Sequence, residues 1–147
     1  MTLIIAADLK QFIERLRVAR LATIDSKFKP HIVPVVFVFD GNHFFIPIDE
    51  KRKKTRAEKL RRIKNIRDNP SVALLIDEYN EDWNRLAFVM IQGIASIVKS
   101  GPQADVQLQQ ALKKLTSKYI QYQNIGIGGI CIKIEPEKVV SWRSSLL

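Results

Sequence analysis

The sequence contains a single cysteine, Cys131, so no disulfide can form within the chain. Cys131 lies in an apolar run, which indicates a buried and unreactive thiol. No apolar run approaches the roughly 20 residues that cross a bilayer. The apolar start of the chain is too short for a secretory leader, and no basic stretch precedes it. These absences predict a cytoplasmic protein without a membrane segment.

Patterns that carry chemistry by themselves are also scarce. His31 and His43 are the only histidines, and no cysteine or carboxylate stands at metal-ligand spacing from them, so no metal site is predicted. The glycines of residues 126–129 lack the lysine and the following Ser or Thr of a phosphate-binding P-loop. No Ser-His-Asp or Cys-His arrangement stands out. The lack of a nucleophile fits an enzyme whose reactivity comes from a cofactor.

The composition is that of an ordinary globular domain. The chain has 147 residues, of which 46% are hydrophobic and 27% charged, and this length suits one domain over residues 1–147 with a real core.

The net charge of +9 is concentrated in residues 51–67, which read KRKKTRAEKLRRIKNIR. This segment holds ten basic residues and one acidic residue, whereas basic and acidic residues balance in the rest of the chain. Such a cluster indicates a local anionic partner.

Short apolar runs rich in Val, Ile and Phe, separated by turns, predict a mainly β fold with peripheral helices. We expect roughly seven antiparallel strands in a split, nearly closed β-barrel. A glycine inside a strand marks a bulge or a close approach of two backbones, so we expect one at Gly93. The strands are expected at residues 20–24, 31–39 and 43–48, which form a meander, and at 71–76, 86–98, 130–134 and 138–142. Helices are expected over residues 8–18, from a capping box at Thr55 and Glu58 to the residues before Pro70, and from residue 101 onward.

The strongest site signal is the basic loop that runs into this middle helix. A helix start offers unpaired N–H groups and a positive dipole end, and guanidinium groups grip phosphate oxygens. Arg61 and Arg62 lie away from the expected apolar stripe. From charge alone, two interpretations stay open: a phosphate site, or a basic helix face that is merely solvated.

Three runs of this chain are similar to a known family: ARLATIDSKFKPHIVPVVFVFDGNHFFIPID, KLRRIKNIRDNPSVALLID and DWNRLAFVMIQGIA. In order and spacing they resemble the FMN-binding split-barrel family, the pyridoxamine 5′-phosphate oxidase-like superfamily. Within it, the Asp-x-Lys, Leu-Arg-Arg and Asp-Trp elements and the ending IKIEPEKVVSWR are most similar to the branch of probable deazaflavin (coenzyme F-420)-dependent enzymes. The resemblance covers roughly residues 10–143.

The resemblance implies which residues bind the cofactor, FMN or the deazaflavin coenzyme F-420. Arg61 and Arg62 match the family's phosphate-binding positions, with Lys51 and Lys53 as helpers. The family is typically homodimeric with the cofactor at the subunit interface, which makes Trp83, Gln92 and Trp142 candidates to approach it from the partner; core or dimer packing is their alternative role. The ring would lie along His31, Val33, Val35, Pro47, Ile48 and Asp49.

The implied function is an oxidoreductase that passes hydride or electrons between the bound cofactor and a small organic substrate. No catalytic residue is identified; His31 is a candidate to tune the ring or relay a proton, because imidazole exchanges protons near neutral pH. Ala87 and Phe88 stand where pyridoxamine-phosphate oxidases have an Arg-Gln pair, which argues against vitamin B6 oxidation. Ten cations exceed what one phosphate needs, which favours the long acidic tail of the deazaflavin.

Two alternatives remain at the level of sequence. The first is a non-enzymatic module that binds or senses the flavin. The second is a nucleic-acid-binding barrel, which is disfavoured because no aromatic residue lies between Phe45 and Tyr79 to stack on bases.

Overall fold

The computed structural model describes residues 5–49 and 60–144. Seven described strands form one antiparallel sheet in the order β2-β1-β5-β6-β7-β4-β3. This confirms the predicted fold class of antiparallel strands with a few helices. The elements are α1 (Ala7–Arg15), β1 (Ala19–Ile24), β2 (Pro30–Val35), β3 (Val38–Phe39), β4 (Phe44–Ile48), α2 (Arg61–Asp68), β5 (Ser71–Glu78), η2 (Trp83–Arg85), β6 (Ala87–Lys99), α3 (Val106–Lys118), α4 (Tyr122–Ile125) and β7 (Ile130–Arg143).

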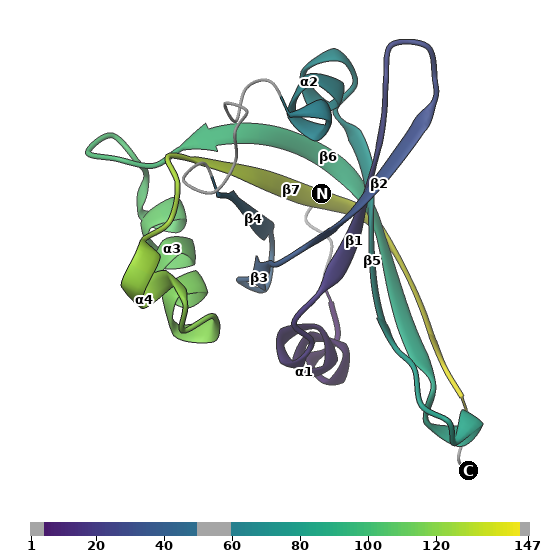
Figure 1. Ribbon diagram of the computed structural model, residues 1–147. Helices are drawn as coiled ribbons and strands as arrows, with labels where there is room; N and C mark the ends of the chain where they lie inside the picture. Colours follow the sequence, from purple (N-terminus) through teal and green to yellow (C-terminus); the bar gives the residue numbers. More distant parts are fainter. Residues whose placement is uncertain (1–4, 50–59, 145–147) are drawn as a thin grey trace.

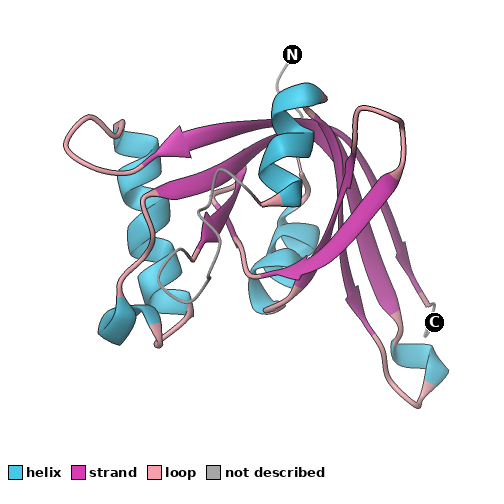
Figure 2. Cartoon of the chain, turned by 45° about the horizontal axis from the view of Figure 1, so that its top comes forward, coloured by secondary structure: helices cyan, strands magenta, loops and turns pink. Residues whose placement is uncertain are grey.

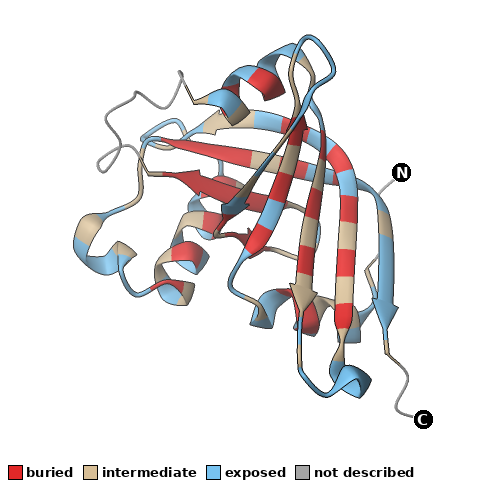
Figure 3. Cartoon of the chain, turned by 45° about the vertical axis from the view of Figure 1, so that its right-hand side comes forward, coloured by how far each residue is buried: buried red, intermediate tan, exposed pale blue. Residues whose placement is uncertain are grey.

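The strand order curls the sheet into a split barrel. β2 and β3 are consecutive in the chain but lie at opposite ends of the strand order, so the sheet bends round to bring its two edges toward each other (Figure 1). The barrel interior holds Phe37, Phe39, Phe44 and many aliphatic side chains. Buried and less buried residues alternate along β5 and β6 (Figure 3), as expected for strands with one face in a core.

The predicted three-strand meander is wrong. Residues 31–39 are two strands, and the hairpins β1–β2 and β3–β4 lie at opposite edges of the sheet. The strand breaks at Phe37, whose side chain enters the core and whose N–H donates to the Tyr119 hydroxyl at 3.2 Å instead of to a neighbouring strand. Tyr119 lies at the end of α3, 82 residues further along the chain, so the local sequence around Phe37 does not indicate this hydrogen bond.

The two predicted closing strands are one continuous strand, β7, paired along its length with β6. A shift in register between Gln92 and Gly93 leaves Glu137 as an extra residue, which confirms the bulge predicted at Gly93. A Cβ atom on Gly93 would lie 2.3 Å from the Glu135 carbonyl oxygen. Only glycine therefore allows the two backbones to approach this closely. β5, β6 and β7 continue beyond the barrel as an arm that ends near η2 (Figures 1 and 2).

The helix boundaries differ from the prediction at three ends. α1 ends at Arg15, because Leu16 adopts extended backbone angles. α3 begins at Val106, where the Asp105 carboxylate accepts a hydrogen bond from the Leu108 N–H at 2.8 Å. α2 begins at Arg61, because Leu60 is extended; the predicted cap residues Thr55 and Glu58 lie outside the described residues.

Cys131 is fully buried beside α3, where burial raises the pKa of its thiol to about 12. The prediction of a buried thiol is confirmed. None of the described helices is long and apolar enough to cross a membrane.

Candidate functional site

The candidate site begins at the N-terminus of α2, where Arg61 and Arg62 are the first two helical residues. Leu60, the cap residue, makes no side-chain capping hydrogen bond, and the first turn holds no acidic residue. The unpaired N–H groups and the positive end of the helix dipole meet here. The positive charges of Arg61 and Arg62 are unfavourable beside the positive end of the helix dipole. An anion bound between them would therefore stabilise the start of α2.

Arg62 gives this interpretation its clearest support. Its Nε atom is buried and has no hydrogen-bond partner among the described residues. Burial lowers the pKa of the Arg62 guanidinium, which means that the charged form lacks compensation. A bound phosphate oxygen would accept from this N–H and supply the missing charge.

α2 is fixed to the barrel by a buried polar contact. The Asn65 side-chain amide donates to the Thr23 hydroxyl at 2.9 Å, and both residues are buried. Asn65 is one helical turn after Arg62, so the two side chains share the face of α2 that meets the sheet. This contact positions Arg62, and no local sequence pattern indicates it, because Asn65 and Thr23 are 42 residues apart in the chain.

His31 lies in the same corner of the barrel. It pairs with Thr23 across β1 and β2, so its side chain is on the face that α2 covers. The Nδ1 atom of His31 is the other buried side-chain atom without a partner in the part of the chain that the structure describes. Arg62 on α2 and His31 on β2 thus each hold one buried nitrogen without a described partner, on the face where α2 meets the sheet.

Arg61 is exposed and lies near the turn between β1 and β2. The pKa of the Asp25 carboxyl there is lowered, chiefly by the hydrogen bond from the Lys29 N–H and to a smaller extent by the Arg61 charge. Arg61 can thus reach a ligand at the helix start from the solvent side. Lys51 and Lys53, the predicted helpers, lie outside the described residues.

The predicted ring-binding residues do not all share one surface. Val33 packs against the barrel core, and Val35 and Ile48 are buried in it. Pro47 is buried on the opposite face of β4 from Ile48 and pairs with Cys131, on the side of α3. Asp49 lies near Tyr122 of α4, whose pKa is raised to about 12 by burial and then by the Asp49 charge. The chain brings His31, Arg61 and Arg62 together, whereas Pro47 and Asp49 lie on the side of α3 and α4.

Trp83, Gln92 and Trp142 are exposed on the far side of the sheet and its arm. Trp83 is 69% exposed and donates weakly to the Tyr79 hydroxyl at 3.4 Å. Trp142 packs against Phe88 with ring centroids 6.1 Å apart. The three residues do not meet the α2 corner within one chain.

Gln92 lines a cavity of about 420 Å³ on the outer face of the sheet. Ala22 and Ala73, which pair with each other on β1 and β5, line this cavity, and their small side chains leave space open there. Gly93 lines it as well. Small residues on two adjacent strands were a visible signal of this groove, but pairing between distant strands was needed to recognise it.

The sequence matches the pyridoxamine 5′-phosphate oxidase family over residues 5–143. The barrel described above is the fold of the pyridoxamine 5′-phosphate oxidase-like split barrels, and the chain belongs to this family. No curated protein matches the chain. The coenzyme F-420 branch is not singled out by these comparisons.

Solved structures share the fold at low sequence identity. A conserved hypothetical protein of Mycobacterium tuberculosis has a TM-score of 0.72 and 19% identity, over 97% of this chain and 87% of the other. An FAD-binding protein of Mesorhizobium loti has a TM-score of 0.68 and 19% identity, over 96% and 95%. HutZ, the heme storage protein of Vibrio cholerae, has a TM-score of 0.69 and 16% identity, over 96% and 95%.

Proposed function

We propose that this chain is a flavin- or deazaflavin-dependent oxidoreductase that acts on a small organic substrate as a cytoplasmic homodimer. The proposal rests on the buried Arg62 Nε at a helix start, which has no hydrogen-bond partner among residues 5–49 and 60–144. A phosphorylated cofactor supplies the partner that this nitrogen lacks. The Mesorhizobium loti neighbour is named as FAD-binding, which favours a flavin among phosphorylated ligands.

In this proposal the cofactor supplies the hydride or electron transfer, and the chain supplies binding and orientation. Arg62 binds a phosphate oxygen from inside the barrel corner, and Arg61 closes over it from the solvent side. The α2 N–H groups donate to the same phosphate. Lys51 and Lys53 of the basic segment add positive charge, and the surplus over one phosphate favours the acidic tail of coenzyme F-420 over FMN.

The ring would extend from this anchor along β2. His31 Nδ1 is oriented into the corner and can exchange a hydrogen bond with a ring heteroatom. Val33 offers an apolar surface beside it. Val35 and Ile48 would act indirectly, by shaping the wall behind these contacts, whereas Pro47 and Asp49 lie on the side of α3 and α4.

A second copy of the chain would complete the site. The outer face of the sheet carries apolar side chains that no described segment covers, among them Ile32, Ile94, Val140 and Trp142. Their burial against a partner would be favourable. In such a dimer Gln92, Trp83 and Trp142 would approach the partner's cofactor, which accounts for aromatic residues exposed on an arm.

The visible absorption spectrum of the freshly purified protein, followed by mass analysis of the molecule released on denaturation, tests this proposal. We expect a flavin or deazaflavin spectrum and a phosphorylated cofactor. Reduction of an added electron acceptor by the loaded protein then separates an enzyme from a module that only binds or senses the flavin. A heme spectrum, or nucleic acid as the released molecule, would overturn the proposal.

A further inference from the structure

A second cavity lies between α1, β3 and α3, away from the α2 corner. Its volume is about 470 Å³, which is within the usual range for small-molecule sites. β3 contacts both helices, and Figure 1 shows this short strand between them. The polar lining consists of Lys113, Lys114, Ser117 and Lys118 of α3 and of Glu14 of α1.

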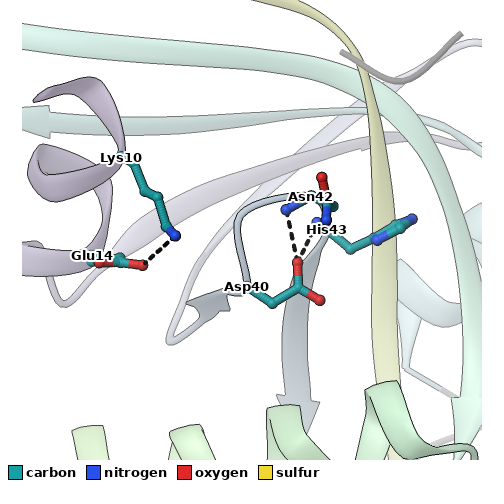
Figure 4. Close-up of polar contacts among 5 residues, drawn as sticks. All are labelled: Lys10, Glu14, Asp40, Asn42 and His43. Carbon is teal, nitrogen blue, oxygen red and sulfur yellow. Dashed lines mark hydrogen bonds and ion pairs between the residues drawn. The ribbon is translucent and has the colours of Figure 1, made fainter. Parts of the chain in front are cut away.

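Positive charge dominates this lining. Three lysines stand against Glu14, whose carboxylate already pairs with Lys10 at 3.9 Å on the neighbouring turn of α1 (Figure 4). The three lysines come from the last turns of α3, where the helix dipole favours cations. Among the described residues none of the three forms an ion pair.

Asp40, the carboxylate that directly follows β3, already accepts hydrogen bonds from other groups. Asp40 accepts hydrogen bonds from the N–H groups of Asn42 at 2.8 Å and His43 at 2.7 Å (Figure 4), and from the Gln107 amide at 3.2 Å. Burial alone would raise the pKa of Asp40, but these bonds outweigh it and the net pKa is lowered. Asp40 therefore does not serve as a counter-ion for the lysines of α3.

Lys118 is the most constrained of the three lysines. Its ammonium donates to the Leu16 carbonyl at 2.6 Å and lies 3.9 Å from the centre of the Phe37 ring. An ammonium has three donors, so others stay open to the cavity. Desolvation, with a smaller contribution from the Arg17 charge, lowers the pKa of Lys118 to about 8, and Glu14 opposes this shift. A bound anion would offset that cost.

β3 lines the cavity with a strand edge that pairs with no described strand on that side. Val38 packs in the cluster beneath α3, whereas Phe39 packs into the barrel. The Asp40 N–H donates to the His43 carbonyl at 3.1 Å. Because hydrogen-bonded and non-bonded pairs alternate in antiparallel ladders, the N–H of Phe39 points away from β4 toward the cavity side.

We propose that this cavity binds a small organic anion, which is one acidic group on an apolar body. The acidic group lies among Lys113, Lys114, Lys118 and the Ser117 hydroxyl, and the apolar body lies along the edge of β3 at Val38 and Phe39. The site is separate from the proposed cofactor site at α2, so one can exist without the other.

The probe that tests this proposal is anilinonaphthalene sulfonate, a fluorescent dye with one sulfonate on an apolar ring system. Phenylnaphthylamine, which has the same rings without the sulfonate, is the matched neutral probe. We expect saturable binding of the sulfonate dye, weakened about tenfold or more by Lys113→Gln with Lys114→Gln, since charge-assisted contacts are lost. Both lysines are exposed, so the fold should tolerate the change.

Lys99→Gln with Lys138→Gln removes the same charge from exposed strand positions and is the matched control. It should leave the dye affinity unchanged. Lys118→Arg keeps the charge and should bind more tightly than Lys118→Gln. Equal losses in the control variant, or equal binding of the neutral probe, would each overturn the proposal.

Discussion

At the scale of one residue, Arg62 lowers the stability of the ligand-free fold but favours the binding of a phosphorylated ligand. A half-buried guanidinium whose Nε has no partner in the described part of the chain destabilises the ligand-free fold. We expect Arg62→Met to raise the free energy of unfolding without ligand by roughly 1 kcal/mol and to abolish the stabilisation that added FMN provides. Urea unfolding with and without FMN measures both effects.

Arg61→Met is the matched control for this prediction. Arg61 is exposed, so its replacement should change the ligand-free stability by less than about 0.5 kcal/mol while still weakening FMN binding. If Arg62→Met instead destabilises the ligand-free protein as a core substitution would, the guanidinium stabilises the fold. Its Nε is then not held unpaired for a ligand.

Lys118 should give a pH dependence of known sign. Its pKa in the folded chain is about 8, below the ordinary 10.5, so between these pH values the unfolded chain holds a proton that the folded chain has released. Stability should therefore rise with pH from about 8 to about 10.5 relative to Lys118→Met, and the difference should be constant below pH 8. Thermal or urea unfolding of both proteins across this range tests it; parallel curves throughout would exclude a depressed pKa.

At the scale of elements, the β6–β7 bulge depends on one glycine. A Cβ atom at Gly93 would meet the Glu135 backbone, which cannot move without disturbing the ladder. Gly93→Ala should cost about 1–3 kcal/mol through this overpacking. Gly129→Ala, where a Cβ meets nothing within 4 Å, should stay within about 0.5 kcal/mol of the parent. Equal stability of the two variants in urea unfolding would show that the close approach is not real.

The elements differ in how far sequence could predict them. Gly93, the buried strands and the end of α2 before Pro70 follow from local rules of turn chemistry and alternation. The break at Phe37 and the placement of β3 depend on Tyr119, far away in the chain. Arg61 and Arg62 were visible as clustered charge, but that Arg62 is buried follows from the docking of Asn65 on Thr23, which only the tertiary fold supplies.

At the scale of the whole molecule, the outer sheet face predicts self-association. Ile32 is 62% exposed in the chain, and Ile94 and Trp142 are exposed on the same side of the sheet. Burying such side chains on dimer formation is favourable, and a charge placed among them opposes it. We expect a dimer in sedimentation experiments and a shift toward monomer for Ile32→Glu, with Phe28→Glu on the exposed β1–β2 turn as control. A monomeric parent protein would contradict the dimer.

The start of α2 is proposed to bind a phosphate. Riboflavin lacks only the phosphate of FMN, so comparing the affinities of the two ligands isolates the contribution of that group. We predict that the parent protein binds FMN about a hundredfold or more tightly than riboflavin, because several charge-assisted hydrogen bonds are involved. In the Arg61→Gln, Arg62→Gln variant the two affinities, measured by fluorescence titration, should become nearly equal. Equal affinities in the parent protein, or a preference for FMN that survives in the variant, would contradict the claim.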